Sequence, residues 1–392
     1  MKKDPYQWFF PAGILFGILG TGFWIAFWLK IIPFYPAPQH SEAMIGGFLL
    51  TVAIGFLMTA VPKFTGTLSA TFLEKASLFV LVLGLWGASF LTERFYFHLI
   101  LLLEILLLVR FALSRFLKSV FRPTPSFILV AFGIFSVLTG DILFCLHDKY
   151  LLSAGWVFFA RLLVFYALFF FLVLGIGTQL VPSILGIARP QASTIQPPTP
   201  LNQPTTDWRA LFRFILYGIL IFFSFVMEAF LNMEWGRLLR AVVVTFIMLY
   251  HWRIYLLKPL TTGILNRCLW GSAWMVVLGV WPPVLHPSFA VHGAHILFIG
   301  ALSLMVFAIM TRVSLSHGGH PLTVEKKAKG LWMLLIFLGA ALVTRLLAPF
   351  VQNYYSHLAY ASIFWIAAAI CWSAQMLLFF RARARLDTLM KK

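Results

Sequence analysis

Twelve long apolar runs, separated by short polar segments, dominate the pattern along this chain of 392 residues. A helix needs about 20 apolar residues to cross the hydrocarbon core of a bilayer. The runs lie at about 9–31, 41–61, 72–92, 96–117, 126–146, 152–181, 210–231, 237–257, 263–285, 289–311, 329–350 and 356–380. Strands of a membrane barrel would instead alternate in polarity over about 10 residues. The pattern therefore predicts an all-α, polytopic membrane protein with about 12 transmembrane helices.

Composition supports a membrane location and explains the strong positive charge. Hydrophobic residues make up 61% of the chain and charged residues only 11%, whereas soluble domains average about 25% charged residues. The formal net charge is +18, but most lysines and arginines fall in the segments on the same side as the N-terminus. The positive-inside rule then places both termini in the cytoplasm. The basic segments are interpreted as topology anchors, not as a surface for nucleic acid.

A proline-rich polar segment divides the chain into two halves. Residues 189–208 combine prolines with Thr, Gln and Asn. Such a composition predicts an extended or disordered linker on the cytoplasmic side. Six helices in residues 1–188 and six in residues 209–392 are expected to form one membrane domain.

A second periodicity links the ends of three predicted helices. The strings TAVPKFTG (59–66), TQLVPSILG (178–186) and MTRVSLSHGG (310–319) recur four helices apart. They predict three pseudo-repeats of four helices each. The alternative is that Thr, Pro and Gly ended these helices independently, as they often do.

Most histidines fall at the predicted periplasmic side, and three of them stand out as metal ligands. His292 and His295 are three residues apart and would share a helix face. His40 opens the second predicted span, two residues before Glu42. Imidazole nitrogens bind metals and haem iron, and two separate helices can approach a flat macrocycle from both sides. His40, His292, His295 and Glu42 are therefore candidate metal-binding residues, although a histidine at a helix end is also commonly interfacial.

Three arginines, Arg161, Arg240 and Arg345, fall inside predicted spans. A guanidinium group matches the geometry of a carboxylate. These arginines could pair with Asp141 and Glu228, or they could equally bind the propionates of a haem. The sequence leaves both interpretations open.

Other motifs limit the range of functions. The chain contains no GxxxxGK[ST] loop for nucleotide-driven transport, no CxxCH for covalent haem, and no CxxC or HExxH zinc motif. Glu104 lies in the middle of an apolar span, in LLLEILLL. It is expected either to have a polar partner or to be protonated.

Two segments combine His, Gly, Pro and Arg at fixed offsets: HSEAMIGGFLLTVAIGFLMTAVPKFTG (40–66) and HGAHILFIGALSLMVFAIMTRVSLSHGGHPL (292–322). Both resemble the NnrS family, bacterial inner-membrane proteins that contain haem and copper and are linked to nitric oxide metabolism and denitrification. The resemblance implies a b-type haem near the periplasmic face and matches family histidines to His40, His295 and His317. A further family histidine is replaced here by Glu42. If that histidine binds copper, copper is in doubt for this chain, and His292 is a candidate compensating ligand.

The expected architecture is also similar to the large subunit of haem–copper oxidases, with twelve spans, cytoplasmic termini and haem ligands on spans 2 and 10. Those oxidases carry copper-ligand histidines on spans 6 and 7. The corresponding segments here, 152–181 and 210–231, contain no histidine. An oxidase-type binuclear centre is therefore not expected, and a likeness of fold alone supports function only weakly.

These observations predict an integral membrane haem-binding protein associated with nitric oxide, nitrosative stress and denitrification. Its expected partners are haem, nitric oxide and membrane lipids, and either electron transfer or sensing would fit two axial histidines. Catalytic turnover is not predicted. Two alternatives remain at this point: a secondary transporter, since repeats and buried charges fit that class too, and a protein that handles haem or copper.

Overall fold

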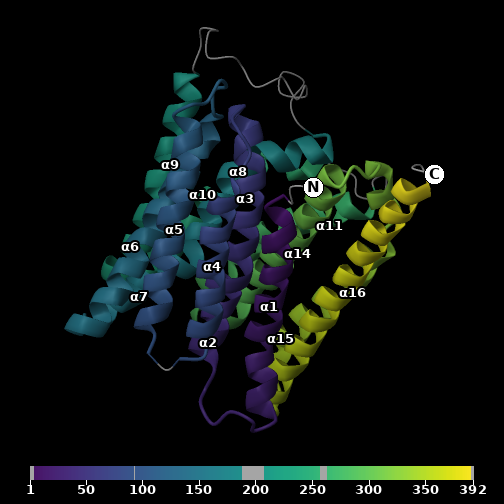
Figure 1. Ribbon diagram of the computed structural model, residues 1–392. Helices are drawn as coiled ribbons and strands as arrows, with labels where there is room; N and C mark the ends of the chain where they lie inside the picture. The colour runs from purple at the N-terminus through teal and green to yellow at the C-terminus, as the bar shows by residue number, and fades with distance from the viewer. Residues whose placement is uncertain (1–3, 92, 188–206, 257–262, 390–392) are drawn as a thin grey trace.

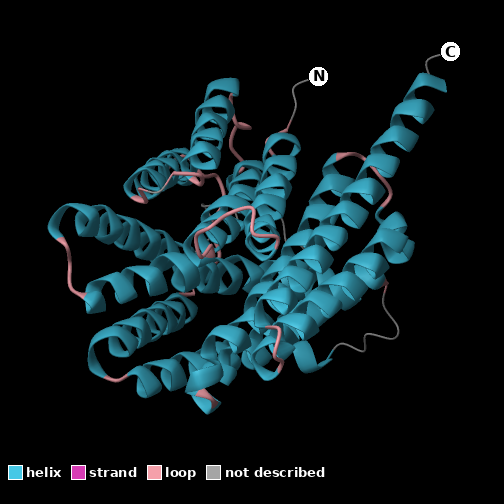
Figure 2. Cartoon of the chain, turned by 90° about the horizontal axis from the view of Figure 1, so that it is seen from below, coloured by secondary structure: helices cyan, strands magenta, loops and turns pink. Residues whose placement is uncertain are grey.

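The computed structural model describes residues 4–91, 93–187, 207–256 and 263–389, and these ranges contain twelve long helices and no strand (Figure 1 and Figure 2). The prediction of an all-α polytopic membrane protein is confirmed. The predicted linker, 189–208, lies outside the described residues except for Asp207 and Trp208. Asp207 accepts a hydrogen bond from the backbone N–H of Ala210 at 3.0 Å and so caps the next helix.

Four of the twelve helices contain a π-helical segment: η1, η3 and η8 each join two α-helical parts, and η4 ends its helix. In chain order the elements are α1 (Tyr6–Trp28), α2 (Ala37–Glu42) with η1 (Ala43–Leu49) and α3 (Leu50–Thr65), α4 (Phe72–Ala88), α5 (Phe95–Phe116), α6 (Ile128–Tyr150), α7 (Ala154–Leu162) with η3 (Leu163–Ala167) and α8 (Leu168–Leu185), α9 (Trp208–Val226) with η4 (Met227–Leu231), α10 (Met233–Tyr250), α11 (Ile264–Val280) with α12 (Pro282–Leu285), α13 (Ala290–His295) with η8 (Ile296–Ser303) and α14 (Leu304–His317), α15 (Lys329–Leu347) and α16 (Tyr354–Leu389).

Ten of these helices in the described ranges are long and apolar enough to cross a membrane. The other two, α4 and α10, occupy the third and eighth predicted spans but differ from them in extent. α4 has 17 residues and ends at Ala88, before the predicted boundary at 92. α10 begins at Met233 rather than 237, because the side chain of Asn232 accepts a hydrogen bond from the N–H of Trp235 and caps the helix early.

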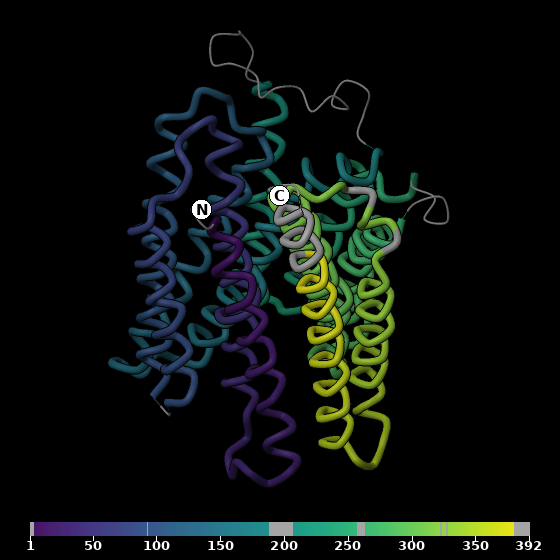
Figure 3. Tube along the Cα trace, turned by 45° about the vertical axis from the view of Figure 1, so that its right-hand side comes forward, coloured from purple at the N-terminus to yellow at the C-terminus, as the bar shows by residue number. Residues whose placement is uncertain are grey.

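α1 begins and α16 ends at one end of the bundle, and α2 lies at the opposite end (Figure 1). We call these the terminus end and the α2 end. The first and last helices pack together, as Figure 3 shows for the purple α1 and the yellow α16. Gly17 makes this approach possible, since a Cβ atom there would lie 2.2 Å from the ring of Trp365. Large apolar side chains remain exposed around the bundle, where a bilayer would cover them.

The three helices that carry the repeated strings share a backbone design. Helices Ala37–Thr65, Ala154–Leu185 and Pro287–His317 are the most buried of the ten candidate spans. Each contains a π-helical segment toward the α2 end. At the terminus end each is followed by a left-handed glycine, with φ of +66° at Gly66, +69° at Gly186 and +68° at Gly319. This recurrence agrees with the predicted three pseudo-repeats.

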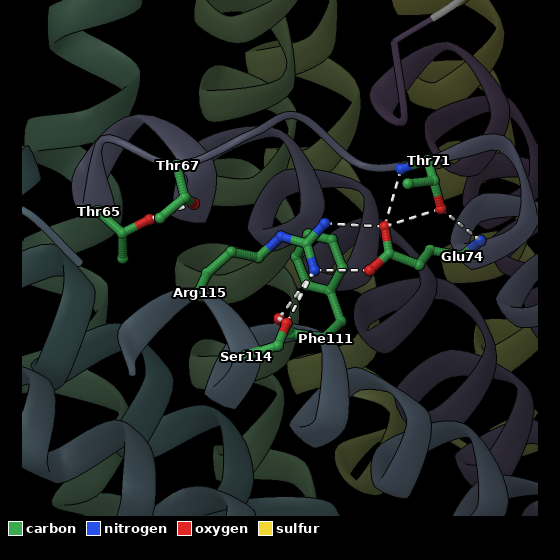
Figure 4. Close-up of polar contacts among 7 residues, drawn as sticks. All are labelled: Thr65, Thr67, Thr71, Glu74, Phe111, Ser114 and Arg115. Carbon is green, nitrogen blue, oxygen red and sulfur yellow. Dashed lines mark hydrogen bonds and ion pairs between the residues drawn. The ribbon is translucent and has the colours of Figure 1, made fainter. Parts of the chain in front are cut away.

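A salt bridge fastens α4 to α5 near the terminus end (Figure 4). Arg115 donates from Nη1 to Oε1 of Glu74 at 2.6 Å and from Nη2 to Oε2 at 2.8 Å. The same carboxylate accepts from the backbone N–H of Thr71 and completes a capping box at the start of α4. The guanidinium also lies 3.8 Å from the ring centre of Phe111. One carboxylate thus defines where α4 begins and how it packs.

Replacing Glu74 with Gln is expected to lower the free energy of unfolding by about 1–2 kcal/mol, because it weakens a charge-assisted, partly exposed pair. The measurement is thermal unfolding of the purified protein in detergent. Glu93→Gln, at an exposed position outside this pair, is the matched control. Equal stability of the two variants would contradict the role of the salt bridge.

Candidate functional site

The α2 end brings His40, His292, His295 and Arg345 into one cluster. His40 lies on α2, both other histidines lie on α13, and Arg345 lies near the end of α15. The Arg345 guanidinium contacts Nδ1 of His292, and its charge acts on the rings of His40 and His295 as well. His40 and His295 are also within electrostatic reach of each other. Segments far apart in the sequence therefore meet here.

The rings of His40 and His295 are oriented in the same way by the backbone. Nδ1 of His40 lies 2.9 Å from the carbonyl oxygen of Gly20, and Nδ1 of His295 lies 2.7 Å from that of Val291. A carbonyl only accepts, so each Nδ1 carries the hydrogen and each Nε2 keeps its lone pair. Metal-binding histidines commonly have this arrangement, with one nitrogen held by a backbone carbonyl and the other facing the metal. Both residues are enclosed by protein on most sides yet retain accessible surface.

His292 has a different hydrogen-bonding state. Its Nδ1 receives an N–H from Arg345, which can only donate. The hydrogen of a neutral His292 must then sit on Nε2, so neither nitrogen offers a free lone pair. The ring also stacks on Phe289, with centroids 5.5 Å apart. Of the two histidines on α13, His295 therefore has the geometry of a ligand, and His292 has the geometry of a hydrogen-bond partner for Arg345.

Arg345 is a buried cation that forms no ion pair with a carboxylate among the described residues. Only 7% of its surface is exposed. Its polar partners are Nδ1 of His292 and the hydroxyl of Tyr354. A charge enclosed in this way normally has an anionic partner. The cluster thus combines two imidazoles that have free lone pairs with one cation that lacks a counter-charge.

The other two candidate arginines lie elsewhere. Arg240 on α10 donates from Nη2 to Oε2 of Glu228 at 2.5 Å and packs over the ring of Phe225 at 4.4 Å. Arg237 donates to the other oxygen of Glu228 at 2.8 Å. Arg161 on α7 is exposed and forms no ion pair within the described part of the chain. The structural ion pair that the sequence left open is thus present at Arg240.

Glu42 is near His40 in sequence but points to another part of the bundle. Its carboxylate is held by the guanidinium of Arg94 and lies 3.7 Å from Nε2 of His98. Within the described ranges, no three His, Cys, Asp or Glu side chains are grouped closely enough to hold a metal ion between them. The structure therefore does not gather Glu42, His40 and the α13 histidines around one ion.

His317, which the family motif also suggested, lies at the terminus end, far from the histidine cluster. It is the last residue of α14. Its Nε2 lies 3.0 Å from Nζ of Lys63, and its Nδ1 lies 3.6 Å from the carboxylate of Asp4. These contacts join α14 to the end of α3 and to the segment before α1.

Two features of the structure were missed at the level of sequence. The carbonyl groups of Gly20 and Val291 fix the tautomers of His40 and His295, and backbone groups leave no signal in a sequence. The contact between His98 and Asp141, at 2.8 Å, joins residues 43 positions apart. A mid-span acid and a helix-end histidine are each visible in the sequence, but no spacing rule pairs them.

Comparison with known proteins gives the identity of the family. The model of the NnrS family, described as NnrS protein, matches residues 2–383. The chain belongs to the NnrS family. No curated protein matches it. Membership of the NnrS family and the membrane-helical fold fit a nitric-oxide-related membrane protein.

Replacing Arg240 with Met in this NnrS protein is expected to lower the free energy of unfolding by about 3 kcal/mol. This is the low end of the range for breaking a buried ion pair, because Glu228 keeps one of its two cationic partners. Thermal unfolding in detergent measures the effect. Arg161→Met is the control, since it removes an exposed charge of the same kind. A variant of Arg240 as stable as the Arg161 control would show that the pair is not structural.

Proposed function

We propose that this NnrS protein is an integral haem-binding protein of the bacterial inner membrane, with a b-type haem held between His40 and His295 at the α2 end. It would act in nitric oxide, nitrosative-stress or denitrification physiology, as the resemblance of its motifs to the NnrS family implies. The observation that carries the proposal is the shared tautomer of the two imidazoles. Each Nδ1–H donates to a carbonyl oxygen, so both Nε2 atoms are prepared to bind a metal.

The surroundings of the two rings fit a large, flat, anionic group. The ring centroids of Trp24 and His40 are 5.8 Å apart, and those of Phe298 and His295 are 6.1 Å apart. Arg345 would balance the charge of a propionate, since guanidinium and carboxylate form paired hydrogen bonds. When bound, a b-type haem supplies one-electron redox chemistry, or an open position for nitric oxide if only one histidine binds. Arg161 and Arg240 take no part in this proposal.

The distribution of basic residues supports a periplasmic position for the α2 end. Lysines and arginines are concentrated around the terminus end, where they follow the positive-inside rule for the cytoplasmic side. Described examples are Lys63, Arg115, Arg122, Arg209 and Arg213. The haem would then lie below the periplasmic surface. Copper is not assigned to these residues, because no group of three ligands forms among those described.

The optical spectrum of the purified protein tests the haem proposal. The wild type is expected to show the absorption of a b-type haem, and His40→Ala and His295→Ala should each lose most of it, because each removes an axial nitrogen. His292→Ala is the matched control, and it should retain haem because His292 serves Arg345 instead. Haem content is measured by extraction, and iron and copper by metal analysis.

A colourless wild type, or spectra unaffected by both ligand changes, would refute the proposal. Loss of haem in His292→Ala but not in His295→Ala would reverse the ligand assignment. Buried carboxyl groups such as Glu104 and Asp141 give some support to a secondary transporter instead. Substrate-dependent uptake by proteoliposomes of the haem-free protein is the result that would favour transport.

Replacing Arg345 with Gln is expected to lower the reduction potential of the haem, since a nearby positive charge stabilises the reduced iron. Redox titration monitored by absorbance measures the shift. Arg161→Gln is the control, and its potential should match the wild type. Equal potentials in the Arg345 variant and the wild type would exclude Arg345 as the cation beside the haem.

A further inference from the structure

A second buried polar cluster lies between α5 and α6, outside the histidine pair. His98 and Glu104 lie on α5, and Asp141 lies on α6. Glu104 and Asp141 have no exposed surface, and His98 is only 2% exposed. The charge of Asp141 acts on Glu104, so the two side chains share one buried region. No part of the proposed haem site uses these residues.

The carboxyl oxygens of this cluster lack the partners that buried carboxylates require. Both oxygens of Glu104 and Oδ2 of Asp141 are buried without a hydrogen bond. Two ionised carboxylates near each other, away from water, are strongly disfavoured by desolvation and by mutual repulsion. The other titratable groups that act on the cluster are Glu42, Arg94, Cys145 and Asp148. The arginine is already engaged by Glu42, so it does not neutralise the inner pair.

His98 connects this pair to the α2 end. Its Nδ1 lies 2.8 Å from Oδ1 of Asp141, and its ring stacks on Phe144 at 4.0 Å. Its Nε2 faces the ion pair of Glu42 and Arg94, and the Arg94 side chain is 19% exposed. From His98, Glu104 lies six residues further along α5, about 9 Å deeper at the helical rise of about 1.5 Å per residue. The residues thus form a line from an accessible arginine to the middle of the helix.

We propose that Glu104 and Asp141 form a proton-binding site in the middle of the membrane, and that His98 connects it to the solution at the α2 end. An entering proton forms an N–H bond at Nε2 of His98, the Nδ1–H bond breaks, and that proton converts the Asp141 carboxylate to the acid. Release follows the same path in reverse: the Asp141 acid returns its proton to Nδ1 of His98 while Nε2 loses one to the outer side, which restores the starting ring. Glu104 is the innermost group, and the Glu42–Arg94 pair stays ionised and holds the outer side of the ring.

The site is separate from the proposed haem site. His40 points to the carbonyl of Gly20 on α1, whereas His98 contacts α6. The proposal therefore stands whether or not haem is bound. Its ligand is a proton rather than a divalent metal, since the described residues form no metal-binding group of three.

Infrared spectroscopy of the purified wild-type protein tests the binding site. A protonated carboxyl group gives a C=O stretching band, which should be present near neutral pH and should shift when water is replaced by D₂O. The band should be lost or reduced in Glu104→Gln and in Asp141→Asn. Glu93→Gln, at an exposed position, is the matched control and should leave it unchanged. If no band depends on Glu104 or Asp141, or if sodium ions abolish it, the proton site is refuted.

The role of His98 is tested by the rate at which that band shifts in D₂O. His98→Gln keeps a donor for Asp141 but cannot take up a proton, and we expect exchange to be slower by at least about a hundredfold, the lower end of the range for acid–base groups. His357→Gln, outside the cluster, is the control and should exchange at the wild-type rate. Monodisperse elution and an unchanged spectrum of the haem, where present, show that the variant is folded.

His98→Phe provides a second variant that preserves the ring stack on Phe144 if the glutamine variant does not fold. Slow exchange in either folded variant supports the connection through His98. Exchange at the wild-type rate in a folded variant would refute that connection. Because these measurements follow carboxyl groups, they give the same answer if the haem proposal fails.

Discussion

The cost of enclosing a charge away from water determines the polar interior of this protein. Most of the buried ionisable side chains that the structure describes are neutralised by a partner from a neighbouring turn or helix. Glu228 is held by Arg237 and Arg240, and Glu42 by Arg94. Arg345 and Glu104 depart from this pattern, one as a cation without a carboxylate and the other as an acid without a hydrogen bond. These two exceptions mark the two sites proposed for the protein.

The two sites share one short helix but lie on opposite sides of it. α2 has six residues and carries both His40 and Glu42. Residues two positions apart on a helix differ in direction by about 200°, more than half a turn, so His40 turns to α1 while Glu42 turns to Arg94 and His98. Any movement of α2 would therefore affect the histidine pair and the outer side of His98 together. The short helix α2 therefore connects the proposed cofactor site and the proposed proton site, although the two sites are not in contact.

π-helical segments directly follow, or lie close after, the candidate ligand histidines on two different helices. η1 begins three residues after His40, and η8 begins directly after His295. A π segment inserts a residue into the helical repeat and changes the direction of the side chains on either side, and such segments are frequent at functional sites. The third helix of this kind, Ala154–Leu185, has its π segment directly after Leu162, without a histidine. The same backbone design thus occurs with and without candidate ligands.

The sequence alone determined the features that depend on local composition. Runs of apolar residues were enough to predict twelve helices, because a helix in lipid must satisfy its own backbone, and the family motifs were enough to predict the NnrS family. Boundaries were less certain, as at α10, where the Asn232 cap begins the helix early. Only the tertiary structure separated His295 from His292, Arg345 from Arg240, and Glu42 from His40. Those distinctions depend on hydrogen bonds and ion pairs between helices far apart in the chain, and no local pattern of residues encodes which partner a buried polar group will meet.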